Sequence, residues 1–447
     1  MKSRSPNIVI LGGTGDLARK KLIPSLYRLW KDRNLQDLTI IGTSRKSLTD
    51  FEYRDYLQKD VPDLERWDEF ASRIKYCQLN FSEKTDYSNL GELLEREDGD
   101  KIFYLATLPQ HFPEISTHLS EYDLVDSRSK VLYEKPFGEN LDSARELNEY
   151  VTSLFSEEKI YRIDHYLDKE LVSNLTVLRF GNTIIEPIWS AEYIDHIQII
   201  ATEEYGVSGR GEFYDSYGAI KDFFQSHLMQ LLVLTTMGCP SAFDAESIRD
   251  SKTEVLKKTS VERVLAGQYM GYRDESGVEE DSETETLAVM ELKIDDSKWQ
   301  DVPIYMFSGK KLQDKITRIY VQFRPPSHRL FDSDSDLAPN AAVVSIEPDK
   351  GIYLVLNTKV PGRLKGSRSR MEFCYTCHHG PNTPRAYENL ISEAIEGDQR
   401  SFLREDEIEE AWRVVDGLDV GRPFVYSPGE VPQQVRDFMG DRDWFGI

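Results

Sequence analysis

The 447-residue chain has few cysteines, no long apolar run and a deficit of positive charge. Four cysteines in so long a chain do not form a disulfide scaffold, so we expect reduced thiols in a reducing cytoplasm. The start "MKSRSPNIVILGG" has only four consecutive apolar residues, too few for the core of a signal peptide. No segment approaches the ~20 apolar residues of a membrane-spanning helix. The sequence therefore predicts a cytoplasmic protein that does not bind membranes.

Basic residues are the minority among the charged ones. The chain has 55 Lys and Arg against 78 Asp and Glu, which gives a formal net charge of −23 at pH 7. A field of this sign repels nucleic acid and anionic membrane surfaces, so neither is an expected partner. The acidic excess is compatible with simple solubility and with a salty cytoplasm alike. In either case, an anionic ligand has to bind in a locally basic pocket.

The first 165 residues alternate short apolar runs with amphipathic helical stretches. This alternation indicates a parallel sheet with helices on both faces. We therefore predict an N-terminal Rossmann-type, doubly wound domain over residues 1–165. Its expected strands are 7–11, 38–42, 76–80, 101–106, 130–134 and 159–163.

Beyond about residue 185 the apolar runs follow one another with few helices between them. Ile319, Val321 and Phe323 alternate with residues that face the opposite side, which predicts a large, mainly antiparallel sheet with one face packed and one available. One long helix over 218–237 interrupts the runs. We predict that residues 166–447 form a C-terminal α+β domain. Its expected strands include 194–203, 286–294, 316–324, 341–348 and 351–358.

A glycine-rich turn joins the first strand to the first helix. Gly13, Gly15 and Ala18 fit G-x-G-x-x-A, and Gly12 adds another residue without a side chain. The backbone can therefore approach a pyrophosphate and offer it N–H groups at the start of a helix. The fingerprint alone is weak, and a purely structural tight turn is the alternative. Its position after the first strand of a βαβ series favours a dinucleotide site.

The second strand ends in Thr43, Ser44, Arg45 and Lys46 rather than in an acid. An NAD enzyme usually carries a carboxylate here for the ribose hydroxyls, whereas a guanidinium binds the 2′-phosphate of NADP. The sequence favours NADP as the cofactor, with NAD or dual use left open.

His227 lies on the apolar stripe of the long helix, four residues from Phe223 and four from Leu231. On this pattern alone it is a buried core histidine. A buried imidazole can also act as a general base if a carboxylate fixes its tautomer. Asp222 lies five residues earlier, not quite on the same face. The residues alone do not choose between these roles or identify the carboxylate.

Cys374, Cys377 and His378 have the C-x-x-C-H spacing of haem attachment, and His379 would extend them to a zinc site. Haem attachment requires export, and zinc would need all its ligands from one short segment. We therefore expect reduced thiols and no metal.

Seven segments together resemble the glucose-6-phosphate dehydrogenase family, in that family's order, over about residues 7–415. The resemblance implies oxidation of D-glucose 6-phosphate at C1 to 6-phospho-D-glucono-1,5-lactone, with hydride transfer to NADP, as the first step of the oxidative pentose phosphate pathway. It also implies that the C-terminal domain binds substrate and forms a homodimer or a dimer of dimers. The segments are "GGTGDLARKKLIPSLYRL", "EKPFG", "RIDHYLDKE", "VLRFGNTIIEPIW", "GRGEFYDSYGAIKDFFQSHLMQ", "VPIYMFSGKKL" and "AYENLISEAIEGDQRSFLREDEIEEAW".

The resemblance assigns a role to individual residues. His227 matches the general base, Asp164 the carboxylate that orients it, and Pro136 a proline that positions Lys135. The residues matched to sugar-phosphate binding are Lys135, His165, Tyr166, Lys169, Glu203, Asp222, Lys310 and Lys315. Those matched to cofactor binding are Gly12, Gly13, Thr14, Gly15, Asp16, Leu17, Lys21, Arg45 and Lys135.

Three positions depart from the family pattern. Asp168 replaces the glycine of H-Y-L-G-K-E, Ser226 replaces the Asn that commonly precedes the catalytic histidine, and Phe307 replaces an Arg before S-G-K. Asp168 brings a negative charge close to the residues matched to phosphate binding, which bears on the substrate range.

Two other functions fit the same two-domain plan. One is a dehydrogenase of a related or unphosphorylated sugar, against which the retained His165, Tyr166 and Lys169 argue. The other is a non-catalytic nucleotide-binding sensor, which would be expected to have lost the imidazole of His227.

Overall fold

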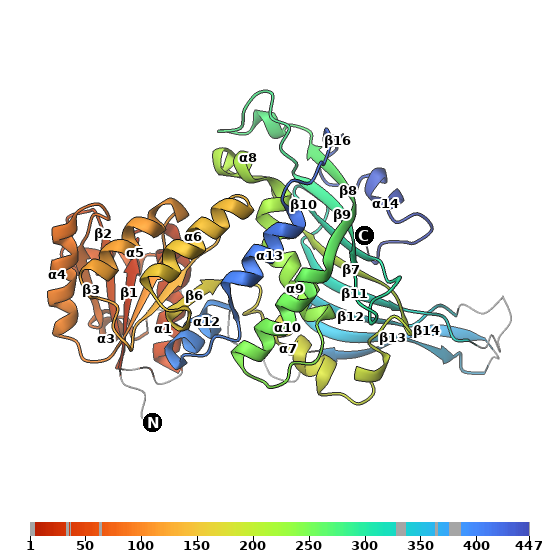
Figure 1. Cartoon of the computed structure of the whole chain (residues 1–447), viewed down its shortest axis with the longest axis horizontal. Helices are drawn as coiled ribbons and strands as arrows, with labels where there is room; N and C mark the ends of the chain where they lie inside the picture. Colours follow the sequence, from red (N-terminus) through yellow and green to blue (C-terminus); the bar gives the residue numbers. More distant parts are fainter. Residues whose placement is uncertain are drawn as a thin grey trace. The chain divides into compact units, whose positions relative to one another are not determined.

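The computed structural model describes residues 5–32, 35, 37–61, 65–327, 337–362, 365–374 and 386–446. The chain divides into two compact units (Figure 1). Unit 1 comprises Met1–Asp168, Ala242–Arg249 and Pro384–Glu409, and unit 2 comprises Lys169–Ser241, Asp250–Thr383 and Glu410–Ile447. The N-terminal unit is thus completed by two segments from later in the chain.

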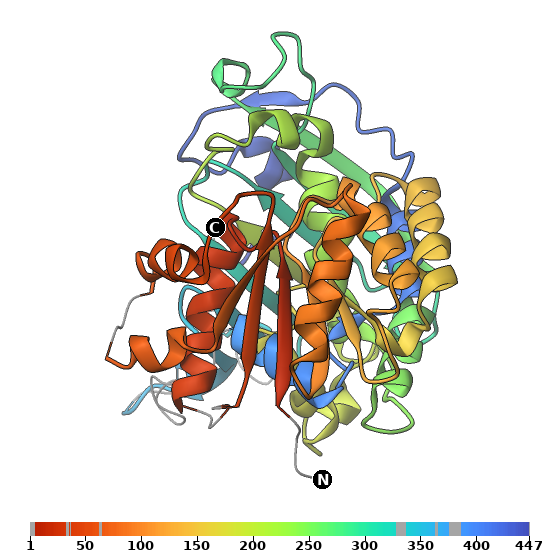
Figure 2. The same cartoon turned by 90° about the vertical axis from the view of Figure 1, so that its left-hand side faces the viewer.

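Unit 1 contains a seven-stranded sheet in the order β15-β6-β5-β4-β1-β2-β3, with helices to either side of the strands (Figure 2). The six N-terminal strands are parallel, and β15 pairs antiparallel with β6. The strands are β1 (Pro6–Leu11), β2 (Thr39–Ser44), β3 (Ile74–Gln78), β4 (Asp100–Leu105), β5 (Lys130–Tyr133), β6 (Ile160–Ile163) and β15 (Phe402–Leu403). The predicted Rossmann-type parallel sheet is confirmed, and β15 extends it by one strand.

Helices α1 to α6 follow the strands of unit 1, and α12 comes from the second half of the chain. The bounds are η1 (Ala18–Leu22), α1 (Ile23–Asp32), α2 (Asp50–Gln58), α3 (Trp67–Ala71), α4 (Lys84–Glu95), η2 (Pro109–His111), α5 (Phe112–Glu121), α6 (Leu141–Leu154), η3 (Glu157–Lys159) and α12 (Ala386–Glu396). Helix α10 (Ala245–Lys258) and helix α13 (Glu405–Val415) each continue from one unit into the other.

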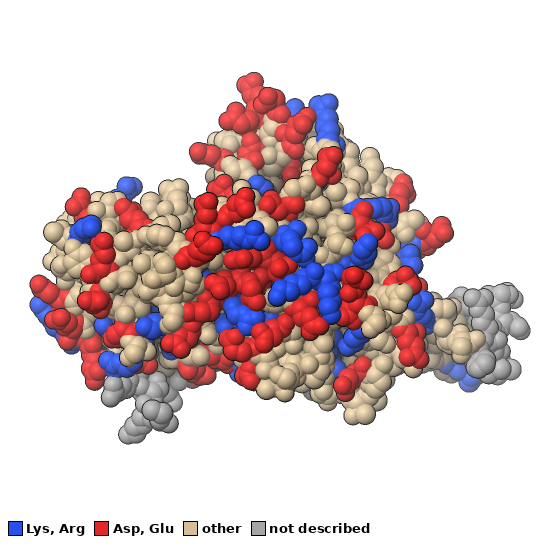
Figure 3. All heavy atoms as spheres, viewed as in Figure 1, with Lys and Arg blue, Asp and Glu red and all other residues tan. Residues whose placement is uncertain are grey.

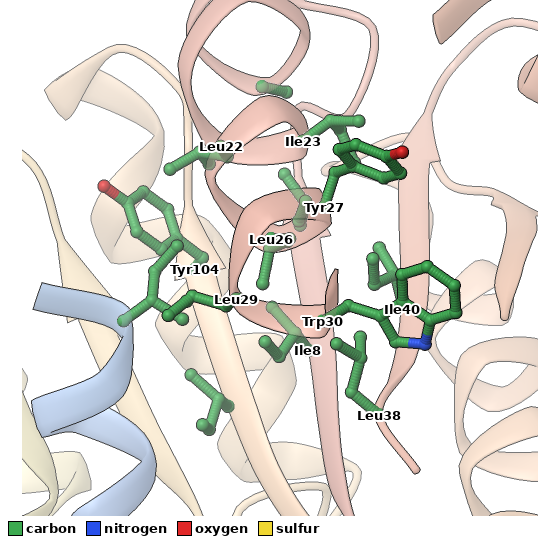
Figure 4. Packing of buried hydrophobic residues seen from close by; sticks show 14 of the residues in the cluster. Ile8, Leu22, Ile23, Leu26, Tyr27, Leu29, Trp30, Leu38, Ile40 and Tyr104 are labelled. Carbon is green, nitrogen blue, oxygen red and sulfur yellow. The ribbon is translucent and has the colours of Figure 1, made fainter. Parts of the chain in front are cut away.

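The core of unit 1 forms where the apolar face of α1 packs on the sheet (Figure 4). Leu22 at the end of η1 and Leu26 and Trp30 of α1 recur every four residues, and all three belong to one buried cluster with Ile8 and Ile40 of the sheet. Full burial of a side chain of this size contributes roughly 1.5–3 kcal/mol. The same cluster includes residues from α12 and β15, namely Leu390, Ile391, Ala394 and Phe402.

Unit 2 contains a nine-stranded sheet in the order β14-β13-β12-β11-β7-β10-β9-β8-β16. The pairs β7–β10 and β8–β16 are parallel and the other six pairs are antiparallel, so the predicted mainly antiparallel sheet is confirmed. The strands are β7 (Ile194–Thr202), β8 (Thr259–Tyr269), β9 (Leu287–Ile294), β10 (Ile304–Gly309), β11 (Ile316–Phe323), β12 (Ala341–Glu347), β13 (Gly351–Lys359), β14 (Gly366–Cys374) and β16 (Phe424–Tyr426).

The helices of unit 2 include the long helical segment, which has three parts rather than one. It runs as α8 (Gly211–Ala219), the π-helix η5 (Ile220–Leu228) and α9 (Met229–Thr236), with a break in helical geometry at Gly218 (φ 68°). The apolar spacing predicted a continuous helix but could not indicate its π geometry. The other helices are α7 (Glu170–Phe180), η4 (Glu186–Ile188), η6 (Tyr272–Asp274) and α14 (Gln433–Asp437).

One face of the sheet was expected to be available at β11, and there the structure differs. Tyr320, on the side opposite Ile319, is buried, because the ring of Phe445 stacks on it with centroids 4.4 Å apart. The guanidinium of Arg318 donates to the carbonyl of Phe445, and Trp444 is also buried. The C-terminal segment therefore covers this part of the sheet, which the strand pattern alone could not show.

Acidic side chains cover much of the face shown in Figure 3, with lysines and arginines between them. Among the described residues, no helix combines the length and the apolar character needed to cross a membrane. Cys77 and Cys239 are free thiols, as expected, but Cys374 is disulfide-bonded, which corrects the expectation of a reduced thiol there. Cys377, His378 and His379 lie outside the described residues.

Candidate functional site

Unit 1 contains a pocket of ≈ 690 Å³ at the carboxyl ends of its parallel strands. The volume is in the range of ~300–1,000 Å³ typical of small-molecule sites, and this edge of a doubly wound sheet is where such folds bind ligands. Each of the six parallel strands contributes a residue just beyond its end. These residues are Gly12, Arg45, Leu79, Ala106, Glu134 and His165.

The glycine turn is held tightly at the floor of this pocket. The N–H groups of Gly12 and Gly13 both donate to the carbonyl of Thr43, at 3.2 and 2.7 Å, which ties the turn to β2. Gly12 has a φ of 95°, and a Cβ there would lie 2.5 Å from the carbonyl oxygen of Ala106. A side chain is therefore excluded by both conformation and space. The phenol of Tyr53 donates to the carbonyl of Gly13 and fixes the turn from α2.

Six of the residues predicted to bind cofactor line this pocket: Gly12, Thr14, Gly15, Leu17, Arg45 and Lys135. Gly13 and Asp16 are not among the lining residues. Gly13 packs against Gly42 and Tyr53, and the carboxylate of Asp16 is 73% exposed and forms ion pairs with Arg19 and Lys20. Lys21 is exposed on the following helical turn. The glycine fingerprint thus combines residues that line the pocket with residues that shape the turn.

Two cations follow β2, of which Arg45 lines the pocket and Lys46 is its neighbour in the chain. Arg45 and Lys46 are exposed, and the ammonium of Lys46 lies 5.2 Å from the centre of the Tyr56 ring. The hydroxyl of Ser44 is hydrogen-bonded to that of Tyr76 at 2.7 Å. This rim is suited to an anionic group such as a phosphate.

The inner end of the pocket contains an acid that the sequence did not single out. The phenol of Tyr104 donates to Glu134 at 2.5 Å, and Tyr387 of α12 also hydrogen-bonds this carboxylate. Burial raises the pKa of Glu134 to about 7, against the lowering effect of Tyr104 and Lys135. Lys135 is joined to Pro136 by a cis peptide bond.

The stretch after β6 places three ionisable residues close together in unit 1. Asp164 is buried, and its carboxylate accepts the N–H of Tyr166 at 2.9 Å. His165 lines the pocket, and its ring is stacked with that of Tyr387, at 6.5 Å between centroids. Tyr166 is buried, so of these three residues only His165 faces the pocket.

Asp168 lies at the end of the same stretch and is buried at 3% exposure. Neither of its carboxylate oxygens has a hydrogen-bond partner among the described residues. Burial, and then the neighbouring carboxylates of Glu393, Asp164 and Glu134, raise the pKa of Asp168 well above its usual range. Burial and the neighbouring carboxylates therefore favour the protonated form of Asp168 over the charged one.

In unit 2, His227 lies on the π-helix η5, and the residue is 2% exposed. It packs edge-on against Phe223 at 5.4 Å. Residues five apart come nearer to one face in a π-helix, which bonds each residue to the fifth one along, than in an α-helix. Asp222 and His227 are therefore better aligned than an α-helix would allow. Such π segments occur frequently at functional sites.

Glu203 and Lys310 form an ion pair in unit 2, with 2.5 Å between the ammonium and the carboxylate oxygen. Glu203 follows β7 and Lys310 follows β10, and these two strands are parallel neighbours. Lys310 is 3% exposed and lies 4.8 Å from the centre of the Tyr214 ring. Two residues matched separately to sugar binding are thus brought together at the ends of adjacent strands.

Lys169 and Lys315, also in unit 2, both bind the carboxylate of Glu347, each at 2.8 Å. The sequence assigned both lysines to phosphate binding but did not identify Glu347. Because both lysines bind the same carboxylate, two cations that are far apart in the sequence lie close together in unit 2.

Two of the departures from the family pattern have simple structural explanations. The hydroxyl of Ser226 donates to the carbonyl of Asp222 within η5, at 2.9 Å. Phe307 is fully buried in β10, and its ring packs against Trp444 at 5.5 Å. Phe307 is therefore a core residue of unit 2.

A parallel sheet with this glycine turn and a pocket at its carboxyl edge is typical of a dinucleotide-binding domain. Residues 9–174 match the family model of the glucose-6-phosphate dehydrogenase NAD binding domain, and residues 176–439 match that of the glucose-6-phosphate dehydrogenase C-terminal domain. The chain belongs to the glucose-6-phosphate dehydrogenase family.

Similar proteins cover the whole chain. Glucose-6-phosphate 1-dehydrogenase of Borreliella burgdorferi is 41% identical, covering 100% of this chain and 99% of the relative. A solved structure of glucose-6-phosphate dehydrogenase in complex with its substrate glucose-6-phosphate has a TM-score of 0.93 at 34% identity, covering 100% of this chain and 99% of the other. Glucose-6-phosphate 1-dehydrogenase from Mycobacterium avium gives a TM-score of 0.88 at 33% identity, with 98% of both chains covered.

Proposed function

We propose that the chain oxidises D-glucose 6-phosphate at C1 to 6-phospho-D-glucono-1,5-lactone, with NADP as hydride acceptor. One observation carries this proposal. The pocket of unit 1 is lined by Arg45 and the glycine turn, matched to the cofactor, and also by Lys135 and His165, matched to the sugar phosphate. The names of the relatives at 35–41% identity support the same activity.

In the proposed reaction His227 is the general base and accepts the proton of the C1 hydroxyl. Asp164 orients the imidazole and stabilises the imidazolium that forms. The C1 hydrogen departs as hydride, for which the bound dinucleotide supplies the acceptor, and the C1–O bond becomes the lactone carbonyl. Both residues are buried, and burial favours a fixed geometry for this proton transfer.

The sugar phosphate is recognised by two sets of residues. Glu203, Asp222 and Lys310 bind hydroxyl groups, and the pairing of Glu203 with Lys310 supports a fixed set of donors and acceptors there. The residues that bind the 6-phosphate are His165, Tyr166, Lys169 and Lys315. The two lysines supply the local positive charge that a protein of net charge −23 needs in order to bind an anionic substrate.

The activity is tested by mixing the full chain with NADP and glucose 6-phosphate and following the absorbance of the reduced cofactor. Glucose without the phosphate serves as the comparison substrate. Turnover of glucose 6-phosphate well above that of glucose is expected. Turnover of glucose but not of its 6-phosphate, or of neither, contradicts the proposal.

Arg45→Ala is expected to raise the KM for NADP by roughly 10-fold to 100-fold and to change the KM for NAD little. The guanidinium at the pocket rim is proposed to bind the 2′-phosphate, which NAD lacks. Steady-state kinetics with both cofactors measures this. Lys59→Ala is the matched control, because Lys59 is an exposed cation of unit 1 paired only weakly with Asp55, at 3.7 Å. An equal loss with NAD and NADP contradicts a 2′-phosphate contact.

We further propose, from the resemblance, that the protein acts in the cytoplasm at the first step of the oxidative pentose phosphate pathway. It assembles as a homodimer or a dimer of dimers through the sheet of unit 2. Light scattering on the purified chain measures the assembly.

A further inference from the structure

Glu347 connects the two lysines of unit 2 that are matched to the phosphate. One carboxylate oxygen lies 2.8 Å from the ammonium of Lys169 and the other lies 2.8 Å from that of Lys315. The side chains of Glu347 and Lys169 are 25% and 18% exposed, whereas that of Lys315 is 54% exposed. Each carboxylate oxygen of Glu347 therefore binds one ammonium group, and the side chain is mostly buried.

The backbone fixes where these three side chains begin. Glu347 is the last residue of β12 and lies opposite Thr317 of the neighbouring strand β11. Lys315 is the residue just before β11 begins. Lys169 immediately precedes α7, which packs on β12. The N–H of Lys315 also donates to the carboxylate of Glu204. Each lysine therefore lies next to the first residue of a helix or strand, and Glu347 ends a strand of the same sheet.

The local charge follows from these contacts. Burial alone would raise the pKa of Glu347. The ammonium groups of Lys169 and Lys315 have the opposite and larger combined effect, so this pKa lies below its usual value. The contact with Glu347 correspondingly raises the pKa of Lys315. The carboxylate of Glu347 offsets one of the two ammonium groups, so the lysine pair presents one positive charge rather than two. An anion that approaches both lysines also meets the carboxylate.

We propose that Glu347 is a positioning residue that fixes the spacing of Lys169 and Lys315 and restrains their affinity for free anions. This inference rests on the proposed function, in which the two lysines bind the 6-phosphate. Inorganic phosphate gains only the contacts of the residues proposed to bind the 6-phosphate, and it meets the repulsion of the carboxylate. A sugar phosphate gains in addition the hydroxyl contacts of Glu203 and Lys310. Glu347 weakens the phosphate contact of both ligands, so that tight binding depends on the hydroxyl contacts that only the sugar phosphate makes.

The test is a calorimetric titration of the full chain with inorganic phosphate. Glu347→Gln keeps the shape and one acceptor but removes the charge, so the Kd for inorganic phosphate is expected to fall roughly 10-fold. The slope of log Kd against log salt concentration should also steepen, a change that a purely structural role would not produce. Glu372→Gln is the matched control, because Glu372 pairs with Arg370 on β14 of the same sheet.

The outcomes separate clearly. Weaker or unchanged phosphate binding by Glu347→Gln, or no measurable binding by either protein, overturns the inference. If this variant does not fold, Glu347→Asp replaces it. The shorter carboxylate releases one lysine, and a gain of about 3-fold in phosphate affinity is expected. The absence of any gain overturns the inference. In the Lys315→Gln background the effect of Glu347→Gln should shrink, because the two residues act together.

The titration needs no turnover, so it is independent of the proposed activity. If Glu347→Gln binds inorganic phosphate more tightly but the wild-type chain does not oxidise glucose 6-phosphate, the proposed function is wrong, and the proposal that Glu347 lowers anion affinity is supported. If the wild-type chain oxidises glucose 6-phosphate but Glu347→Gln shows no gain in phosphate affinity, the proposal for Glu347 is wrong and the proposed function is supported.

Discussion

Replacing Asp168 by Asn is expected to stabilise the protein by about 2 kcal/mol or more at pH 8, and by less at pH 5. Asn has the shape of the protonated carboxyl but never ionises. Because Asp168 is buried without a hydrogen-bond partner among the described residues, and near Glu393, Asp164 and Glu134, its charged form is strongly disfavoured in the folded state. The variant removes that cost.

The direction of the pH dependence follows from the raised pKa of Asp168. In the unfolded chain an Asp ionises near pH 3.9, whereas the folded protein keeps the proton to a higher pH. Between these two pKa values, folding is therefore accompanied by the uptake of a proton at Asp168. The free energy of unfolding is highest below about pH 3.9. It falls by up to ~1.4 kcal/mol per pH unit as the pH rises toward the pKa of Asp168 in the folded protein.

Urea unfolding of the full chain at pH 5 and pH 8 measures this effect. Asp98→Asn is the matched control, since the side chain of Asp98 is 90% exposed and lies in the same unit. A gain for Asp168→Asn of equal size at both pH values would show that a packing change, and not ionisation, is responsible.

Replacing His227 by Asn is expected to lower kcat on the order of 100-fold or more. The amide preserves a polar side chain of similar position but cannot accept the C1 hydroxyl proton. Steady-state kinetics with NADP and glucose 6-phosphate on the variant and the wild-type protein measures this loss.

His196→Asn is the matched control for this experiment. His196 is also buried in unit 2, where its ring hydrogen-bonds the carboxylate of Asp195 and the amide of Gln198. Its replacement is expected to cost stability rather than turnover. Near-wild-type turnover by His227→Asn would make His227 a core histidine, the alternative that its apolar stripe allows.

The features that the sequence predicts well are local ones. The six parallel strands follow from apolar runs between helical stretches, and the glycine turn follows from residues adjacent in the chain. Arg45 could be placed at the rim of the pocket because it comes within three residues of the end of a predicted strand, and in a parallel sheet all such ends lie at one edge.

The features that escaped prediction depend on long-range contacts or on subtle geometry. Glu347 ends an apolar strand 178 residues after Lys169, and nothing near it indicates which cations it binds. Tyr387 reaches Glu134 only because α12 joins unit 1. The π-helix around His227 differs from an α-helix by one residue in its bonding, and the apolar stripe is compatible with both. A charged residue at the end of an apolar strand is the one signal that could have drawn attention to Glu347.

The assembly of unit 1 from three chain segments limits how the gene can be divided. A fragment that stops at Asp168 would lack β15, which pairs with β6, and α12, whose Leu390, Ile391 and Ala394 belong to the core. It would expose an unpaired strand edge and an apolar surface, both of which promote aggregation. The dinucleotide-binding half of this chain is therefore not a portable module, and a chimaera that exchanges it with another enzyme must also carry residues 386–403.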